Sequence, residues 1–419
     1  MFIMNYDNMG KIFYKNPSEY KEIYEKRYNA DNTYRYDFLL GNNPAFVVMS
    51  NAVWDLIYSI DNLDKKLQYL LMLGFVPGVA INQFIITCLI DEVKLTNEIE
   101  GVHSTRKEIQ SVLTDIDSLP KKVKENKEYR LKGLVSKYLL LLQSEKALKL
   151  ESLQDVRKLY DEFVAPEIGA SKGELPDGEL FRSSGAEVLS KGGRVIHRGV
   201  FPEQKIEESM KQALNILNDR DKYNPLVNIA VFHYLFGYTH PFYDGNGRMS
   251  RFISSAYLGR HLTKIIGLGL SYTIKENITT YYSMFKDTNH PNNKGDVTAF
   301  VLEFLLFIKV TLSRILKILE DKLAKLDFYT EKLELLTEAA FSDKEECIVY
   351  ILLQATLFAE DKSMTIKEVY EAFIDSEQQK VSESNIRQII KQLPQDLVQE
   401  EKRGRSFYYS INLSTLDEL

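Results

Sequence analysis

The side chains with the clearest capacity for chemistry lie in one segment, residues 240–251, which reads HPFYDGNGRMSR. The spacing of apolar residues predicts a helix over 224–239, opened by the capping pair Asn224 and Pro225, and a second helix over 247–263. The glycine-rich loop between them leads directly into a helix N-terminus. Unpaired backbone N–H groups and the helix dipole make such a terminus a binding site for phosphate or another anion.

The loop and the start of the second helix also carry side chains that suit a phosphate site. Gly245 and Gly247 flank Asn246 and allow the backbone to approach a phosphate closely. Arg248 and Arg251 are three residues apart on one helical face, so both can reach the same anion. These residues predict a phosphate cradle with two cationic clamps.

Two further side chains would add metal and proton chemistry. Asp244, in the loop, could hold Mg²⁺ against phosphate oxygens. His240, just upstream, is the natural general base, because an imidazole titrates near neutral pH. One short segment thus supplies an anion site, a metal ligand and a proton acceptor.

The segment resembles the Fic motif, H-x-F-x-(D/E)-G-N-G-R-x-x-R, and matches it at every specified position. The resemblance covers about residues 81–310. It implies a cytoplasmic protein adenylyltransferase that moves AMP from ATP, with Mg²⁺, to a Ser, Thr or Tyr hydroxyl of a target protein. The related Doc kinases typically have Lys where Gly247 stands, whereas phosphocholine-transferring relatives share most of the motif.

The same resemblance implies a role for each residue of the motif. His240 would deprotonate the target hydroxyl, Asp244 would hold Mg²⁺, and Asn246 would contact the α-phosphate. The backbone of 245–248 would form the anion hole, and the two arginines would engage the β- and γ-phosphates. The residues expected to contact ATP or to pack this loop are Phe242, Gly245, Asn246, Gly247, Arg248, Arg251, Tyr281 and Tyr282.

A second match lies far upstream, where residues 96–101 read TNEIEG. This resembles the (S/T)-x-x-x-E-(G/N) pattern on the inhibitory helix of N-terminally regulated Fic proteins. In a helix predicted over 81–100, Thr96 and Glu100 are four residues apart on one face, and Gly101 would end the helix. The resemblance implies that Glu100 pairs with Arg251 and denies that arginine to the γ-phosphate.

A short hairpin is predicted over 187–198, where a Lys-Gly-Gly turn separates two apolar runs. Fic proteins have at this place a flap that pairs with the backbone of the target, and Val195 or Ile196 would act as its clamp. His197, in this hairpin, is expected at the surface. His233 falls on an apolar helical face and is expected to be a buried structural residue.

The fold expected is an all-α Fic core with this hairpin, followed by a winged helix-turn-helix domain. The N-terminal helical region, 1–110, would include the inhibitory helix (about 81–101), the catalytic core would cover 111–325, and the winged helix 340–419. Helices are predicted, before and within the core, over 44–59, 64–73, 129–146, 152–164, 204–218, 274–286 and 297–320. The winged helix would contain helices over 343–357, 365–374 and 383–393 and a hairpin over 397–410.

Charge and cysteine content narrow the class of protein. The 53 basic and 59 acidic residues give no strongly basic signal for nucleic acid or a membrane surface. Only Cys88 and Cys347 are present, which excludes a disulfide scaffold and fits a reducing compartment. No targeting peptide is recognisable at the start, and the uncharged stretch 67–90 is broken by Gly74, Pro77 and Gly78, so two buried helices are expected instead of a membrane span.

The winged helix leaves its own role open. Residues 343–419 hold 9 basic and 15 acidic side chains, which argues against strong DNA binding, although the turn at 402–405 is basic. Protein docking or homodimerisation is at least as good an explanation.

Rival functions for the whole chain also stay open. They are removal of AMP by a glutamate-activated water, transfer of a different nucleotide, and DNA-binding regulation with a Fic sensor core. The intact His240 and Asp244 weigh against the last of these.

Overall fold

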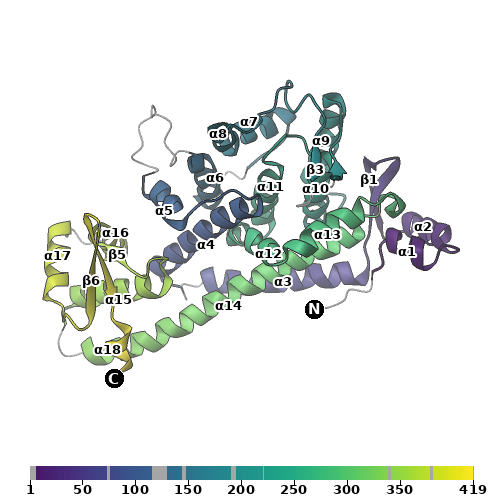
Figure 1. Ribbon diagram of the computed structural model, residues 1–419. Helices are drawn as coiled ribbons and strands as arrows, with labels where there is room; N and C mark the ends of the chain where they lie inside the picture. Colours follow the sequence, from purple (N-terminus) through teal and green to yellow (C-terminus); the bar gives the residue numbers. More distant parts are fainter. Residues whose placement is uncertain are drawn as a thin grey trace. The chain divides into compact units, whose positions relative to one another are not determined.

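The computed structural model describes residues 6–72, 76–115, 130–143, 148–189, 195–219, 221–337, 341–377 and 381–418. The chain forms two compact units, one made of residues 1–64 and 89–313 and the other of residues 65–88 and 314–419. Both are mostly helical, with small antiparallel sheets (Figure 1). Among the described residues, no helix combines the length and the apolar character needed to cross a bilayer.

The first unit begins with two short helices and a hairpin and continues with the helices around the site. Its elements are α1 (Met9–Lys15), α2 (Tyr20–Asn29), β1 (Thr33–Leu40), β2 (Asn43–Val48), α5 (Arg106–Asp115), α6 (Lys132–Gln143), α7 (Leu153–Phe163), α8 (Ala165–Ala170), β3 (Glu187–Leu189), β4 (Val195–Arg198), α9 (Glu203–Asn218), α10 (Pro225–Thr239), α11 (Asn246–His261), η2 (Lys264–Leu268), α12 (Leu270–Glu276), α13 (Ile278–Thr288) and η3 (Pro291–Asn293). Three long helices have residues in both units, namely α3 (Asn51–Met72), α4 (Gly78–Ile99) and α14 (Thr298–Thr337).

Helix α10 forms the centre of the first unit. It is apolar on nearly all sides, and 12 of its residues are buried. The side chain of Asn224 caps its first turn by accepting the N–H groups of Leu226 at 2.9 Å and Val227 at 3.4 Å, with Pro225 at the first helical position. A helix that is hydrophobic all round must be enclosed by others, so α10 fixes the loop that follows it.

The expectation of an all-α class with strands only in the flap and the wing is wrong at the N-terminus. Residues 33–48 form an antiparallel hairpin, β1 with β2, and the helix predicted over 44–59 begins only at Asn51. The backbone of Phe46 in β2 also bonds to the loop near residue 296, with its N–H donating to Gly295 at 2.9 Å and its C=O accepting from Val297 at 2.9 Å. These distant partners, which the local pattern cannot show, stabilise a strand.

Two helix boundaries also differ from prediction. The segments predicted over 44–59 and 64–73 merge, beyond the β2 strand, into the single helix α3. The helix predicted over 274–286 is instead two helices, α12 and α13, which meet at Asn277 with φ −116° and ψ 31°. The side chain of Asn277 donates to the C=O of Thr273 at 2.9 Å, which satisfies the backbone where the helix is interrupted.

The hairpin predicted over 187–198 is present as β3 and β4, which pair antiparallel. Its turn, residues 190–194, lies outside the described residues. We call the β3–β4 hairpin the flap.

The second unit contains the three helices and the hairpin predicted for the C-terminal segment, together with a short strand, β5, and a short last helix, α18, that were not predicted. They are α15 (Asp343–Phe358), β5 (Met364–Thr365), α16 (Ile366–Glu377), α17 (Glu383–Gln392), β6 (Val398–Arg403), β7 (Ser406–Ile411) and α18 (Leu413–Asp417). The strands form an antiparallel sheet in the order β5-β7-β6. Its assignment as a winged helix-turn-helix domain stays a prediction.

Candidate active site

The loop between α10 and α11 is shaped by two residues with left-handed backbone conformations. His240 ends α10 with φ 50° and ψ 61°, and Gly245 precedes α11 with φ 83°. A Cβ atom at position 245 would lie 3.0 Å from Val164 and 3.2 Å from Ile168. Position 245 therefore requires a residue that tolerates a left-handed backbone and has no side chain, and glycine meets both requirements. As a result, the loop packs closely against α8 and turns sharply into α11.

Asn246 and Phe242 hold the loop together. The Asn246 side chain accepts the N–H of Phe242 at 3.0 Å and donates to its C=O at 2.7 Å. The buried ring of Phe242 stacks on Tyr160, with ring centroids 3.8 Å apart, and lies edge-on to Phe181. The Asn246 amide, expected at the α-phosphate, therefore already braces the loop, and Phe242 packs this loop into the core.

The backbone of His240 is held by Arg182, a residue that sequence analysis missed. The buried Arg182 guanidinium donates to the C=O groups of His240 at 2.8 Å, Val200 at 2.6 Å and Ser184 at 2.5 Å. A Cβ atom on Gly199 would collide with Arg182 Nη2 and lie 3.0 Å from His240 Cβ. Arg182 thus ties the loop that begins at His240 to the segments on either side of the flap. No local motif marks it, since its partners are all main-chain atoms.

The surroundings of His240 favour the neutral imidazole. Burial, followed by the positive charges of Arg182 and His197, lowers the pKa of His240 to about 4. At neutral pH the ring therefore carries no charge and can accept a proton.

His197 in the flap is not the free surface residue that was expected. It is partly buried, and its Nε2 atom lies 2.6 Å from the C=O of Tyr238 at the end of α10. Burial lowers the pKa of His197 as well. The contact holds strand β4 beside the end of α10.

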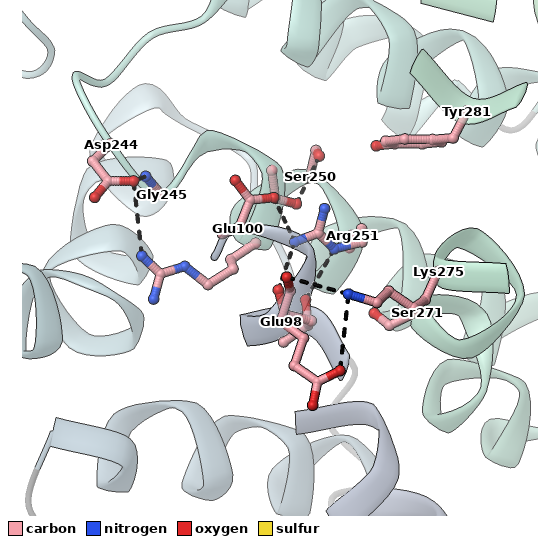
Figure 2. Close-up of polar contacts among 12 residues, drawn as sticks. Glu98, Glu100, Asp244, Gly245, Ser250, Arg251, Ser271, Lys275 and Tyr281 are labelled. Carbon is pink, nitrogen blue, oxygen red and sulfur yellow. Dashed lines mark hydrogen bonds and ion pairs between the residues drawn. The ribbon is translucent and has the colours of Figure 1, made fainter. Parts of the chain in front are cut away.

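The first arginine of the motif, Arg248, is fully buried and forms an ion pair with Glu167 of α8. Its Nη2 atom lies 3.9 Å from Asp244, whose side chain is half-exposed and accepts the N–H of Gly245 at 2.5 Å (Figure 2). Glu167 had no motif to reveal it. Its carboxylate fixes the direction of the Arg248 side chain under the loop.

Several buried polar atoms around this loop have no hydrogen-bond partner among the described residues. They are Nε of Arg248, the hydroxyl of Tyr160 and Oγ1 of Thr239. Buried donors of this kind are normally satisfied, so a bound anion with its water would account for them. The donor set fits a phosphate group at the start of α11.

The residues also fit a magnesium ion held mainly by its nucleotide. The described residues contain no cluster of three or more His, Cys, Asp or Glu side chains that could enclose a metal. Asp244 has an exposed carboxylate in the loop, just before the N-terminus of α11. Mg²⁺ commonly binds through one or two carboxylates together with substrate phosphates, and Asp244 suits that arrangement.

The second arginine, Arg251, is completely buried and donates three hydrogen bonds to Thr96 in α4 and to Glu100 just after it (Figure 2). Its Nε atom donates to Thr96 Oγ1 at 2.9 Å and Nη2 donates to the C=O of Thr96 at 3.0 Å. Nη2 also forms an ion pair with Glu100 Oε1 at 2.7 Å. The residues of the TNEIEG segment therefore occupy Arg251.

The Glu100 carboxylate also lies directly against the loop. A Cβ atom on Gly247 would overlap Glu100 Oε1 and lie 2.8 Å from its Cδ atom and 3.1 Å from Arg251 Nη1. Only a glycine leaves room for this approach. A carboxylate thus occupies the space beside the α11 N-terminus.

Helix α4 ends where the sequence predicts. Gly101 has φ 75°, and its N–H donates to the C=O of Glu98 at 3.2 Å, while the N–H of Val102 donates to Asn97 at 2.9 Å. Lys275 of α12 contacts the same terminus, 3.5 Å from the C=O and 3.9 Å from the carboxylate of Glu98. These contacts fix the position of Glu100.

A buried glutamate, which the sequence patterns did not reveal, anchors α4 about two turns earlier. Glu92 accepts the N–H of Ser271 at 2.9 Å, the Ser271 hydroxyl, and the hydroxyl of Tyr138 at 3.2 Å. Burial raises the pKa of Glu92 to about 7, against the opposing effect of these hydrogen bonds.

The two tyrosines expected at the adenine have different surroundings. Tyr281 is buried, and its hydroxyl lies 2.8 Å from Nε2 of His233, whose Nδ1 atom lies 2.9 Å from Ser254 Oγ. His233 is thus a buried structural residue, as predicted. Tyr282 is 50% exposed, and burial together with the Glu100 charge raises its pKa. Of the pair, only Tyr282 presents a surface to a ligand.

The flap residues are placed only in part. Val195 lies on β4 and is 38% exposed, whereas the side chain of Ile196 lies outside the described part of the structure. Just after the flap, the N–H of Val200 donates to the C=O of Thr239 at 3.1 Å. The flap therefore joins the core immediately beside His240.

Comparison with known proteins agrees with the fold. The chain resembles the structure of a Fic family protein from Desulfovibrio desulfuricans G20, with 15% identity and a TM-score of 0.51 over 87% of this chain and 97% of that one. It also matches Fic-1 (residues 134–508) from C. elegans, with 17% identity and a TM-score of 0.47 over 75% of this chain and 82% of that one. Residues 150–258, which include the whole 240–251 segment, match the Fic/DOC family model. The chain therefore contains a region, residues 150–258, that matches the Fic/DOC family, and it has a mostly helical Fic-like fold.

Proposed function

We propose that this protein is an adenylyltransferase that moves AMP from ATP to a Ser, Thr or Tyr hydroxyl of a target protein, and that Glu100 holds it inactive. One observation carries the proposal. The neutral imidazole of His240 and the N-terminus of α11, which suits an anion, lie at the two ends of one short loop. Glu100 forms an ion pair with Arg251 of α11, the arginine that would otherwise bind ATP.

The chemistry proposed is a displacement at the α-phosphorus. His240 accepts the proton of the target hydroxyl while its oxygen bonds to phosphorus, the bond to the β-phosphate oxygen breaks, and pyrophosphate leaves. The backbone N–H groups at the start of α11 and the Arg248 guanidinium stabilise the negative charge. Mg²⁺, held by Asp244 and the nucleotide, would neutralise phosphate charge.

The flap would present the target. Its attachment to α10 through His197 and to the catalytic loop through Arg182 keeps it beside His240. A short exposed hairpin can pair with an extended target segment by adding a strand. A hydroxyl on that segment would then lie near the imidazole.

Inhibition follows from the contacts of Glu100. As long as Arg251 is bound to Glu100 and Thr96, it cannot engage the γ-phosphate, and the carboxylate repels that phosphate from the loop. ATP held by the loop backbone alone would have its triphosphate displaced from in-line geometry.

The direct test uses ATP labelled at the α-phosphate, cell lysate, and mass spectrometry of the labelled peptides. We expect Glu100→Gly to transfer AMP to itself and to lysate proteins, and the double variant Glu100→Gly/His240→Ala to transfer none. ATP labelled at the γ-phosphate distinguishes AMP transfer from phosphoryl transfer. Labelling from the γ-phosphate, or labelling that survives loss of His240, would refute the proposed reaction.

Removal of AMP is a second candidate, favoured by the position of Glu100 against Gly247. A carboxylate there could activate a water molecule for attack on a phosphorus bound at the loop. A target labelled with AMP by the Glu100→Gly variant serves as the substrate. Release of AMP by wild type but not by Glu100→Gly would support this second activity, and no release by either would exclude it.

A further inference from the structure

A cavity of about 600 Å³ lies in the first unit, apart from the phosphate loop. The C-terminal half of α11 forms one wall, and the ends of α6 and α9 and the start of α10 form the others. We propose that this cavity binds a small organic oxyanion, a carboxylate or phosphate head group on an apolar body. None of the residues assigned to the candidate active site lines it.

The cavity is large enough for such a ligand and has an apolar floor. Its volume falls in the range of small-molecule pockets, which are lined mainly by hydrophobic side chains with a few placed polar groups. The hydrophobic side chains that line it include Leu140, Leu141, Leu217, Phe252 and Ala256. A hydrocarbon or aromatic ligand body would be removed from water there.

The polar group with the clearest function is Arg260. Its guanidinium carbon lies over the Tyr257 ring, 3.8 Å from the ring centre, in a cation–π contact. The Tyr257 ring is itself fixed, because its hydroxyl donates to Asn218 at 3.0 Å and accepts the N–H of Leu150 at 3.3 Å. Arg260 thus packs against a ring that is itself held in place.

Two donors of Arg260, Nε and Nη2, are buried and have no partner among the described residues. These nitrogens share one edge of the guanidinium, the edge that binds a carboxylate or phosphate through two parallel hydrogen bonds. Buried donors are rarely left unsatisfied in folded proteins. An oxyanion is the ligand that satisfies both at once.

A second polar group in the wall points to the same ligand. Ser255, on the same helix as Arg260, lines the cavity and is 1% exposed. Its hydroxyl also lacks a hydrogen-bond partner among the residues that the structure describes. It would supply a third hydrogen bond to the head group.

The charge around the cavity favours an anion. Lys149 lies exposed in the wall, and Lys264 donates to the C=O of Leu142 at 3.3 Å. One acidic residue, Asp219, also lies in the wall, and its Oδ1 atom accepts the N–H groups of Asp221 at 3.1 Å and Lys222 at 3.0 Å, so basic residues outnumber it there. Lys137 is already paired with Glu162. The remaining positive charge is that of Arg260 and the lysines beside it.

Four probes separate the two parts of the proposed ligand, each titrated by calorimetry into the full chain without nucleotide. Octanoate and octyl phosphate carry both parts, octanol lacks the charge, and inorganic phosphate lacks the apolar body. We expect saturable binding of octanoate, octyl phosphate or both, about tenfold or more tighter than either incomplete probe. The tighter of the two complete probes identifies the head group.

Variants locate the site. We expect Arg260→Gln, and Ala256→Phe, which fills the cavity, each to weaken binding by about tenfold or more. Arg260→Lys keeps the charge but not the paired donors and should weaken it as well. Arg387→Gln, which removes an exposed arginine of the second unit, is the matched control and should bind as wild type does. Thermal melts establish that each variant is folded.

Several results would overturn the proposal. They are the absence of saturable binding of both complete probes at millimolar concentrations, equal binding of octanol, and unchanged affinity in folded Arg260→Gln and Ala256→Phe. Because no nucleotide or transfer assay is involved, the outcome is independent of the proposed adenylylation.

Discussion

The Glu100 carboxylate lies 2.7 Å from Arg251 Nη2, which joins two residues 151 positions apart in the chain. Arg251 is completely buried, whereas the Glu100 side chain is 25% exposed. Breaking the pair leaves a buried arginine without its charge partner, which is costly unless another anion replaces the carboxylate. The γ-phosphate of ATP is the anion that we propose.

Glu100→Gly should raise the rate of AMP transfer by roughly 10²-fold, since a small displacement of the reacting phosphorus costs about that much. The rate of self-labelling with α-labelled ATP measures it. Glu98→Gly is the matched control, because it places glycine in the last turn of α4, just before Glu100, and keeps the Glu100 carboxylate that pairs with Arg251. Equal activation by both variants would show that loosening α4, and not freeing Arg251, is responsible. Arg251→Ala should stay inactive.

The pH profile should show no loss of activity near the usual pKa of histidine. With burial, Arg182 and His197 lowering the pKa of His240 to about 4 from 6.5, the imidazole stays neutral on acidification until well below pH 6. We therefore expect kcat/KM of Glu100→Gly for its target to be nearly flat between about pH 8 and pH 5. An acid limb centred at about pH 6.5 would contradict this assignment.

Arg182→Lys should lower kcat by about tenfold to a hundredfold with little change in ATP affinity, because Arg182 holds the backbone of His240 and does not touch the nucleotide site. A lysine keeps the charge but cannot reach several carbonyls at once. Single-turnover rates and ATP titrations in the Glu100→Gly background separate the two quantities. Arg198→Lys, in an exposed ion pair of the flap with Glu187, is the matched control. A change in ATP affinity alone would contradict the positioning role.

Glu92→Gln should stabilise the protein increasingly as the pH rises. The pKa of Glu92 is raised by burial from 4.5 to about 7, so the folded state retains its proton where the unfolded state has lost it. The contribution of this carboxyl to stability is full below pH 4.5 and is lost as the pH rises through 7. The amide variant has no such loss. Thermal melts from pH 5 to pH 9 measure the difference, and a constant difference would rule out the buried ionisation.

The full chain should bind duplex DNA weakly at physiological salt. Residues 343–419 contain 9 basic and 15 acidic side chains, and at the end of β6 Arg403 is already paired with Glu401 and Asp361. Few counterions would therefore be released on binding. Fluorescence anisotropy with labelled random and genomic duplexes measures the affinity. Tight, sequence-specific binding would favour the regulator function instead.

Local signals in the sequence were sufficient to predict where the helices around the loop begin and end. Asn224 and Pro225 open α10, Gly245 permits the turn into α11, and Gly101 ends α4, because caps and left-handed positions act over a few residues. The flap was equally visible, since a Gly-Gly turn between two apolar runs favours a hairpin.

Only the tertiary structure showed those strands and side-chain roles that depend on partners distant in the chain. The pattern over 44–48 suits a helix, but pairing with β1 and with the loop at 295–297 makes it a strand. Arg182, Glu167 and Glu92 carry no motif, and each acquires its role only from buried partners elsewhere in the fold. The sequence by itself determined the shape of the loop at 240–245, because its caps and glycines act locally. Only the three-dimensional fold decided which charges enclose that loop, because buried charges are stabilised by whichever groups the packing brings within hydrogen-bonding distance.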